Sequence, residues 1–278
     1  MNESTSVLTL GKGKTVFTKT WLPDDQKTVR ANVILVHGLG EHVGRYEYVA
    51  DAFTRHGIAL YGFDHIGHGH SSGKKGCMSY EDAYQIINLI KAQLLESQPD
   101  IPIFSYGHSM GGGIVLAYGL KYSEHVRGII ATSPAIGLAE EKSPAAVNFI
   151  AFMKKICPNM TVENGLSLNG LCHDKEVVKK YEADPLVHGR ISMQLANDLI
   201  QTGKSLLAND KPYPVSLLLV QGKLDNLVNP KATEAFAAKT TGADITFKEY
   251  EEGFHELHNE PFKDEVISMY IDWITKRI

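Results

Sequence analysis

The sequence lacks the features that mark several classes of protein. It has no apolar run long enough to span a bilayer, and its first residues lack a charged segment followed by an apolar one. It also lacks internal repeats and low-complexity segments. We therefore expect no transmembrane helix and no signal peptide, and a cytoplasmic location. Peripheral association with a membrane remains open.

Positive charge and cysteine are also scarce. The formal net charge is -4, and no block of basic residues occurs, so we expect no nucleic acid partner. Any attachment to a membrane should then depend on apolar contact. The three cysteines, Cys77, Cys157 and Cys172, are an odd number without the spacing of metal ligands. We expect them to be buried, reduced thiols, and we expect no metal site.

The chain instead contains many apolar segments that are predicted as strands alternating with helices. Its 278 residues are 43% hydrophobic, enough for one large domain. Strands are predicted at 16–21, 32–36, 58–63, 101–106, 126–132, 215–221 and 245–250. Helices are predicted at 45–56, 79–96, 230–239 and 261–277, and another follows residue 111. This alternation is typical of a parallel sheet with helices on both faces.

The alternation stops between residues 137 and 210. No convincing buried strand occurs there, and helices are predicted at 144–156, 173–181 and 191–207. We predict a core of residues 1–136 and 211–278, with residues 137–210 inserted into it as a helical cap. The cap should lie over the carboxyl ends of the strands, where open α/β sheets bind ligands.

The most informative motif is Gly107-His108-Ser109-Met110-Gly111, which has the pattern G-x-S-x-G. It stands between a predicted strand and a predicted helix. In α/β-hydrolases this arrangement forms the nucleophile elbow, a sharp turn that lifts a serine above the sheet. Glycines at both ends of the motif let strand and helix pack closely around a strained turn. Ser109 is therefore the predicted nucleophile.

A serine hydroxyl is a weak nucleophile that needs a base, which an acid must orient. In this fold the order along the chain is serine, acid, histidine. Asp225 and His255 each follow directly after a predicted strand, at the same sheet edge as Ser109. We predict His255 as the base and Asp225 as the acid. Two alternatives remain open: Asp225 is an ordinary surface residue, or His258 is the base.

The oxyanion formed during ester cleavage needs two N–H donors aimed at one point. The residue after the nucleophile supplies one, which is Met110. The second should come from the loop after the strand at 32–36, where His37-Gly38-Leu39-Gly40 offers the N–H of Leu39. The alternative for this loop is a tight structural turn.

Five stretches of the chain together form a more specific pattern. They are residues 37–46, 64–71, 107–112, 184–186 and 255–258. On these motifs the chain resembles the α/β-hydrolase superfamily, and more closely the monoglyceride lipases (monoacylglycerol lipases) and their lysophospholipase-like relatives. The resemblance implies an α/β-hydrolase fold, a mostly parallel central sheet flanked by helices, with a helical cap or lid. It implies no metal or cofactor.

The resemblance also implies roles for matching residues. It places the catalytic triad at Ser109, Asp225 and His255. It places the oxyanion amides at Leu39 and Met110. It places the pocket for a glycerol head at Glu41, Arg45 and His258, with Tyr181 near the glycerol exit.

The activity that the resemblance implies is hydrolysis of monoacylglycerols through an acyl-enzyme intermediate. A lysophospholipase or a broad carboxylesterase is the alternative enzyme. A non-catalytic binding protein on the same fold is the rival from another class.

Two features of the sequence each allow two interpretations. Glu41 and Arg45 are four residues apart and would share a helix face if the helix began early; otherwise they are a surface ion pair. The segment 145–153 is apolar on nearly every helical face and is followed by Lys154 and Lys155. It is either a cap helix packed on the core or an exposed lid that contacts a membrane or lipid droplet and admits lipid.

Overall fold

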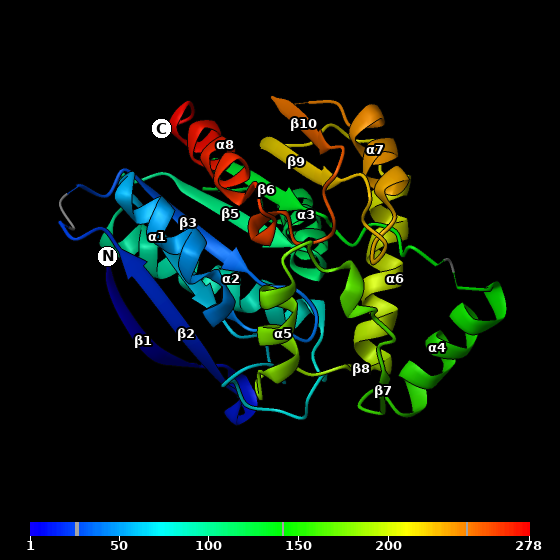
Figure 1. Cartoon of the computed structure of the whole chain (residues 1–278). Helices are drawn as coiled ribbons and strands as arrows, with labels where there is room; N and C mark the ends of the chain where they lie inside the picture. The colour runs from blue at the N-terminus through cyan, green and yellow to red at the C-terminus, as the bar shows by residue number, and fades with distance from the viewer. Residues whose placement is uncertain (26–27, 141, 243) are drawn as a thin grey trace.

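The computed structural model describes residues 1–25, 28–140, 142–242 and 244–278. These residues form an eight-stranded sheet in the order β1-β2-β4-β3-β5-β6-β9-β10 (Figure 1). The strands are β1 (Asn2–Thr9), β2 (Thr15–Leu22), β3 (Ala31–Val36), β4 (Ile58–Phe63), β5 (Ile103–His108), β6 (Gly128–Thr132), β9 (Ser216–Gly222) and β10 (Ile245–Tyr250). β2 runs antiparallel to β1 and β4, and the other neighbours are parallel. The mostly parallel sheet that the alternation predicts is confirmed.

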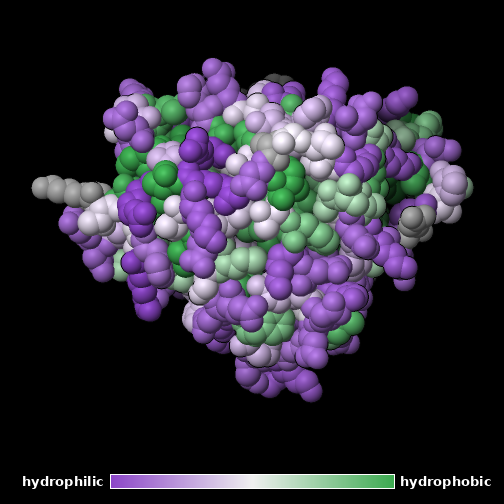
Figure 2. Space-filling model, turned by 90° about the horizontal axis from the view of Figure 1, so that it is seen from above, coloured by the Kyte–Doolittle hydropathy of each residue, from purple (hydrophilic) through white to green (hydrophobic). Residues whose placement is uncertain are grey.

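Helices cover both faces of this sheet. One face carries α1 (Glu47–Arg55) and α8 (Lys263–Thr275). The other carries α2 (Tyr80–Ser97), α3 (Met110–Lys121), α6 (Met193–Ala208) and α7 (Pro230–Lys239). Successive residues of β3 point to opposite clusters, since Leu35 packs with α1 and α8 while Val36 packs with α2 and α3. Hydrophilic residues dominate the surface seen from above, with smaller hydrophobic areas between them (Figure 2).

Local sequence explains where two of the helices begin. The Ser79 hydroxyl accepts a hydrogen bond from the Asp82 N–H, and the Asp82 carboxylate accepts one from the Ser79 N–H. This capping box starts α2 where the sequence predicts it. Asn229 caps α7, and Pro230 occupies its first position, where a proline costs no hydrogen bond.

Between β6 and β9 the chain forms α4 (Pro144–Ile156), β7 (Thr161–Glu163), α5 (Lys175–Ala183), β8 (Arg190–Ser192) and then α6. The helix predicted at 144–156 matches α4. No residue of α4 is buried, and this helix stands at the edge of the molecule (Figure 1). By contrast, α6 contributes Leu195 and Leu199 to the same hydrophobic cluster as the sheet.

The ends of the cap at 137 and 210 remain a prediction. Residue 141 of the predicted cap, and residues 26–27 and 243 of the predicted core, lie outside the described residues. Short 3-10 turns complete the described elements, at Gly11–Gly13, Val43–Tyr46, Leu168–Gly170 and Leu257–Asn259.

Several elements differ from the prediction. β1 was not predicted, because as an exposed edge strand it lacks an apolar alternation. β7 and β8 are three residues long and mostly unburied, so they carry no strand pattern either. α1 begins two residues later than predicted, after a 3-10 turn.

The expectations for one proline and two cysteines are wrong. α8 begins at Lys263 with Phe262 as its N-cap, so Pro261 precedes the helix and is not part of its first turn. Cys157 is exposed because it caps the exposed helix α4, and Cys77 is only partly buried, whereas Cys172 is buried as expected. Within the described residues, no helix is both long and apolar enough to cross a membrane.

Candidate active site

Ser109 occupies a strained turn between β5 and α3. Its backbone lies at φ 56° and ψ -119°, a conformation that residues other than glycine rarely adopt. A Cβ on Gly107 would clash with the carbonyl oxygen of Gly111, and a Cβ on Gly111 would clash with that of Val36. The two glycines of G-x-S-x-G therefore permit the turn that the motif predicts. Such strain is found where a structure holds a functional side chain in place.

Asp225 and His255 meet at the carboxyl ends of β9 and β10. His255 Nδ1 lies 2.7 Å from Asp225 Oδ2. The other carboxylate oxygen, Oδ1, accepts hydrogen bonds from the N–H groups of Leu227 and Val228, which fix its orientation. Both residues are buried. The carboxylate can therefore hold the ring with Nε2 free to act as a base.

Ser133 also holds His255, although the sequence gives no sign of this role. Its hydroxyl donates a 2.7 Å hydrogen bond to the carbonyl oxygen of His255. Ser133 follows β6, the strand next to β5, and has a positive φ of 41°. The sequence shows only a serine directly after a predicted strand, and the positive φ that sets this residue apart is visible in the structure alone.

The pH dependence of hydrolysis should report His255. Burial alone would lower its pKa, but the Asp225 carboxylate and its hydrogen bond outweigh burial, so the pKa lies above 6.5. The base is protonated below this pKa, so kcat/KM should rise with pH and reach half its plateau above pH 6.5. Initial rates with a soluble ester across pH would check this. A half-point below the ordinary histidine value would contradict it.

A cavity of about 390 Å³ contains Ser109 and His255. Leu39 and Met110 line it as well, so both predicted oxyanion residues lie beside the predicted nucleophile. The rest of its wall is mostly apolar and comes largely from α4, α6 and the loop after β9. Its apolar residues include Ala135, Leu138, Phe149, Ile150, Leu199, Ile200, Leu227 and Val228.

Two buried histidines hold the loop of residues 37–40, which contains the predicted oxyanion donor Leu39. His37 Nε2 lies 3.1 Å from the His65 N–H and must accept that bond, so His37 Nδ1 carries the proton and donates to the Gly38 carbonyl at 2.8 Å. His65 Nε2 donates to the His37 carbonyl at 3.1 Å. Burial lowers the pKa of both rings, which keeps them neutral in this pattern. Sequence reasoning missed these roles, although each histidine directly follows or nearly follows a central strand.

Arg45 lies at the centre of a buried polar network. Its guanidinium contacts Glu41 at 2.5 Å and Glu256 through two bonds of 2.7 Å, and it covers the ring of Tyr181 at 4.5 Å. The alternative of a surface ion pair is wrong, because Glu41 is only 2% exposed. The pair does not share a helix face either, since Arg45 lies in a 3-10 turn and α1 begins at Glu47.

Glu256 is the member of this network that sequence reasoning missed. It directly follows the predicted base, and its carboxylate also accepts a bond from Asn259. Burial alone would raise its pKa, but the Arg45 guanidinium outweighs burial and holds the pKa of Glu256 well below 4.5. The available signal was a second carboxylate directly after His255, a residue that already has Asp225 as its predicted acid.

Replacing Glu256 by glutamine should destabilise the fold. It leaves a buried guanidinium with one carboxylate fewer, and removing one partner of such a pair costs about 3 kcal/mol. A carboxyl group whose pKa is lower in the folded than in the unfolded protein stabilises the fold above its unfolded pKa, and this stabilisation is lost as the pH falls below 4.5. The difference in unfolding free energy between the two proteins should therefore be full at neutral pH and shrink in acid. Urea unfolding across pH would check it.

The control for this change is Glu163→Gln. Glu163 pairs with Arg190 on the surface and is 70% exposed, so its loss should cost less than about 1 kcal/mol. Equal losses for the two variants would contradict a special role of the buried network.

His258 lies beside this network with both ring nitrogens unpaired among the described residues. It stacks on Tyr46 with ring centroids 5.0 Å apart, and Tyr46 in turn donates to Glu41. Burial lowers the pKa of His258 to about 4, so the ring is neutral at neutral pH. Since His255, and not His258, is paired with Asp225, the geometry favours His255 as the base.

The network lies next to the nucleophile. A Cβ placed on Gly38 would lie 3.3 Å from Ser109 Cβ and 2.8 Å from Glu41 Oε1. The Gly38 N–H donates to that same oxygen at 2.6 Å, so Glu41 also holds the loop of residues 37–40 in place. The described residues that line the Ser109 cavity do not include Glu41, Arg45, Tyr181 or His258.

Comparison with known proteins gives matches to a family model and to individual relatives. The model of the family described as serine aminopeptidase, S33, matches residues 27–262. A monoacylglycerol lipase of Mycolicibacterium smegmatis is 33% identical over 93% of this chain and 92% of its own length. An uncharacterized abhydrolase domain-containing protein of Dictyostelium discoideum is 36% identical over the whole chain, which spans only 30% of that protein.

The fold is also similar to that of solved structures. The crystal structure of Paleococcus ferrophilus monoacylglycerol lipase superposes with a TM-score of 0.88 at 29% sequence identity. The match covers 95% of this chain and 99% of that one.

Proposed function

The chain belongs to the α/β-hydrolase superfamily and its monoglyceride lipase family, and from that premise we propose that it hydrolyses monoacylglycerols to fatty acid and glycerol. The α/β-hydrolase fold is confirmed, and the protein is a carboxylic ester hydrolase. The observation that carries the proposal is a mostly apolar cavity lined in part by Ser109 and His255, with a buried polar network next to Gly38.

In the proposed reaction Ser109 attacks the ester carbonyl while His255 takes its proton. The N–H groups of Leu39 and Met110 stabilise the oxyanion. The intermediate collapses, His255 protonates the leaving glycerol oxygen, and an acyl-enzyme remains. Water, deprotonated by His255, then releases the fatty acid and restores the serine. Asp225 keeps the ring in the required tautomer and stabilises its charged form.

Selection among lipids should depend on the head group. Burying a methylene from water gains about 0.8 kcal/mol, but a lipid chain in a membrane or micelle is already dry. Transfer of the acyl chain from the membrane into an apolar cavity therefore contributes little to the selection of one lipid over another. We place the glycerol site at Glu41, Arg45, His258 and Tyr181. The unpaired nitrogens of neutral His258 offer a donor and an acceptor, which suits a diol.

Fatty-acid release from four esters would test this function. The esters are a long-chain monoacylglycerol, the matching diacylglycerol, a lysophosphatidylcholine and a short soluble ester, each with Ser109→Ala as control. Preference for the monoacylglycerol, lost in the control, supports the proposal. Equal or better turnover of the lysophospholipid or the short ester would favour the lysophospholipase or broad carboxylesterase alternative instead.

We also propose that α4 contacts a lipid surface. Phe152 and Ile156 on this helix are 58% and 59% exposed, and Lys154 and Lys155 lie between them. Apolar side chains flanked by lysines are typical of helices that lie in a membrane interface. The exposed state of the helix favours the lid over the packed cap helix.

Replacing Phe152 and Ile156 by aspartate should weaken binding to phosphatidylcholine vesicles at least about tenfold, because two apolar side chains lose their burial. Sedimentation with vesicles would measure it, while hydrolysis of a short soluble ester should be unchanged. The matched control replaces exposed Val7 and Leu89, on β1 and α2, by aspartate. An equal loss of vesicle binding in the control would contradict the proposal that α4 is the lipid-contacting surface.

A further inference from the structure

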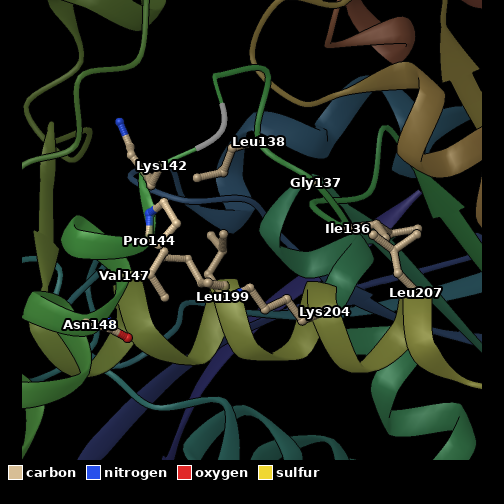
Figure 3. Close-up of a pocket in the computed structure, with 11 residues that line it drawn as sticks. Ile136, Gly137, Leu138, Lys142, Pro144, Val147, Asn148, Leu199, Lys204 and Leu207 are labelled. Carbon is tan, nitrogen blue, oxygen red and sulfur yellow. The ribbon is translucent and has the colours of Figure 1, made fainter.

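A second cavity, of about 400 Å³, lies beside the one that contains Ser109. Figure 3 shows Lys142 and Pro144 at the start of α4 on one side of it, Ile136 and Leu207 on the other, and Lys204 along α6 below. Its volume falls in the range of small-molecule sites, about 300–1,000 Å³. Neither the proposed reaction nor the proposed lid uses this space.

The two cavities share part of their walls. Leu138, Lys142, Leu199 and Ile200 line both of them. At the second cavity α6 approaches the chain so closely that a Cβ on Gly203 would clash with the carbonyl oxygen of Ile136. Shared side chains therefore separate the second cavity from the serine, and α6 closes its floor.

The lining of the second cavity specifies a ligand chemistry. Most of its side chains are aliphatic, and its charged residues are Lys142 and Lys204. No carboxylate occurs among the described residues that line it. Long lysine side chains can cover apolar surface while their ammonium groups stay at its edge in water. Such a site favours a molecule with an apolar tail and an anionic head over a neutral ester or an alcohol.

We propose that the second cavity is a binding site for a long-chain fatty acid, with its carboxylate toward Lys142 and Lys204. The inference rests on the proposed function, because that reaction releases a fatty acid at Ser109. Because the two cavities share wall residues, the fatty acid is released next to the second cavity, and a shift of these shared side chains would let its tail move from one apolar space to the other. The product thereby vacates the catalytic cavity before it leaves the protein.

The test measures binding and not turnover. A long-chain alkyl fluorophosphonate first blocks Ser109 and fills its cavity. Oleate, kept below the concentration at which it aggregates, then displaces a fluorescent fatty acid. The blocked protein should retain an oleate site, and Lys142→Glu with Lys204→Glu should weaken it about tenfold. Lys204→Glu alone, on the exposed side of α6, should weaken it less.

Matched controls separate charge from other effects. Lys211→Glu with Lys231→Glu makes the same change in net charge at exposed lysines outside this cavity and should leave oleate binding unchanged. Oleyl alcohol has the same tail without charge, so it should bind more weakly than oleate and equally to both double variants.

Three results would overturn the inference: no oleate site after Ser109 is blocked, equal affinity in the Lys142→Glu, Lys204→Glu variant, or an equal effect on oleyl alcohol. Failure of the fluorophosphonate to react would count against the proposed function instead. Oleate would then be titrated onto the unlabelled variants, with the same expected differences.

Discussion

Ser109→Ala is expected to lower kcat for monoacylglycerol hydrolysis about 10⁶-fold, the size of effect seen when a serine nucleophile is removed elsewhere. No other hydroxyl lines the cavity among the described residues, so no neighbour can replace it. The variant should remain folded, because alanine loses only the hydroxyl. Fatty-acid release and labelling by a fluorophosphonate probe would measure the effect together.

Ser105→Ala is the matched control. Ser105 lies on β5, four residues before Ser109, and its buried hydroxyl has no hydrogen-bond partner among the described residues. It should keep both activity and labelling. Hydrolysis by Ser109→Ala within tenfold of the parent protein would refute the proposed serine mechanism. Absence of labelling in the parent protein would instead favour the rival interpretation, a non-catalytic binding protein on the same fold.

Asp225→Asn is expected to lower kcat about 10⁴-fold while the fold is retained. The asparagine oxygen can still accept the bonds that Asp225 Oδ1 receives from Leu227 and Val228. Its amide group, however, would face the Nδ1–H of His255 and the side-chain amide of Gln221, and all of these are donors. His255 would then turn to the tautomer in which Nε2 carries the proton and cannot act as a base.

The same change should alter the pH profile. The Asp225 carboxylate is the main group that raises the pKa of His255, so the remaining activity of the variant should titrate at lower pH. Asp198→Asn is the control, since Asp198 bonds Gln194 away from Ser109. A kcat near that of the parent protein, or an unchanged pH profile, would argue that Asp225 does not orient the base.

The site could be predicted from sequence where the chemistry is local or follows from chain order. The turn at Ser109 needs only the glycines on either side of it, and Met110 must follow. Asp225 and His255 are far apart in sequence, but both end parallel strands, and parallel strands end at one edge of a sheet. Mostly apolar runs were enough to find the central strands, because these strands are buried on both faces.

Surface elements gave no comparable pattern. Residues 2–9 are mostly polar, and only pairing with β2 makes them a strand. The same holds for β7 and β8, whose few residues carry no periodicity. For α4 the sequence predicted the bounds but left its exposure open, since an apolar helix looks alike whether it is buried or faces lipid.

The sequence by itself thus determined the order of the central strands and of the helices around them, and the residues of the proposed triad, because these depend on spacing along the chain. Only the tertiary structure decided which side chains from distant parts of the sequence come into contact. Glu256 joins Arg45 over 211 positions, and Ser133 joins His255 over 122. It also decided where cavities remain between α4 and α6. Such contacts depend on the packing of distant elements, and no local pattern of residues encodes them.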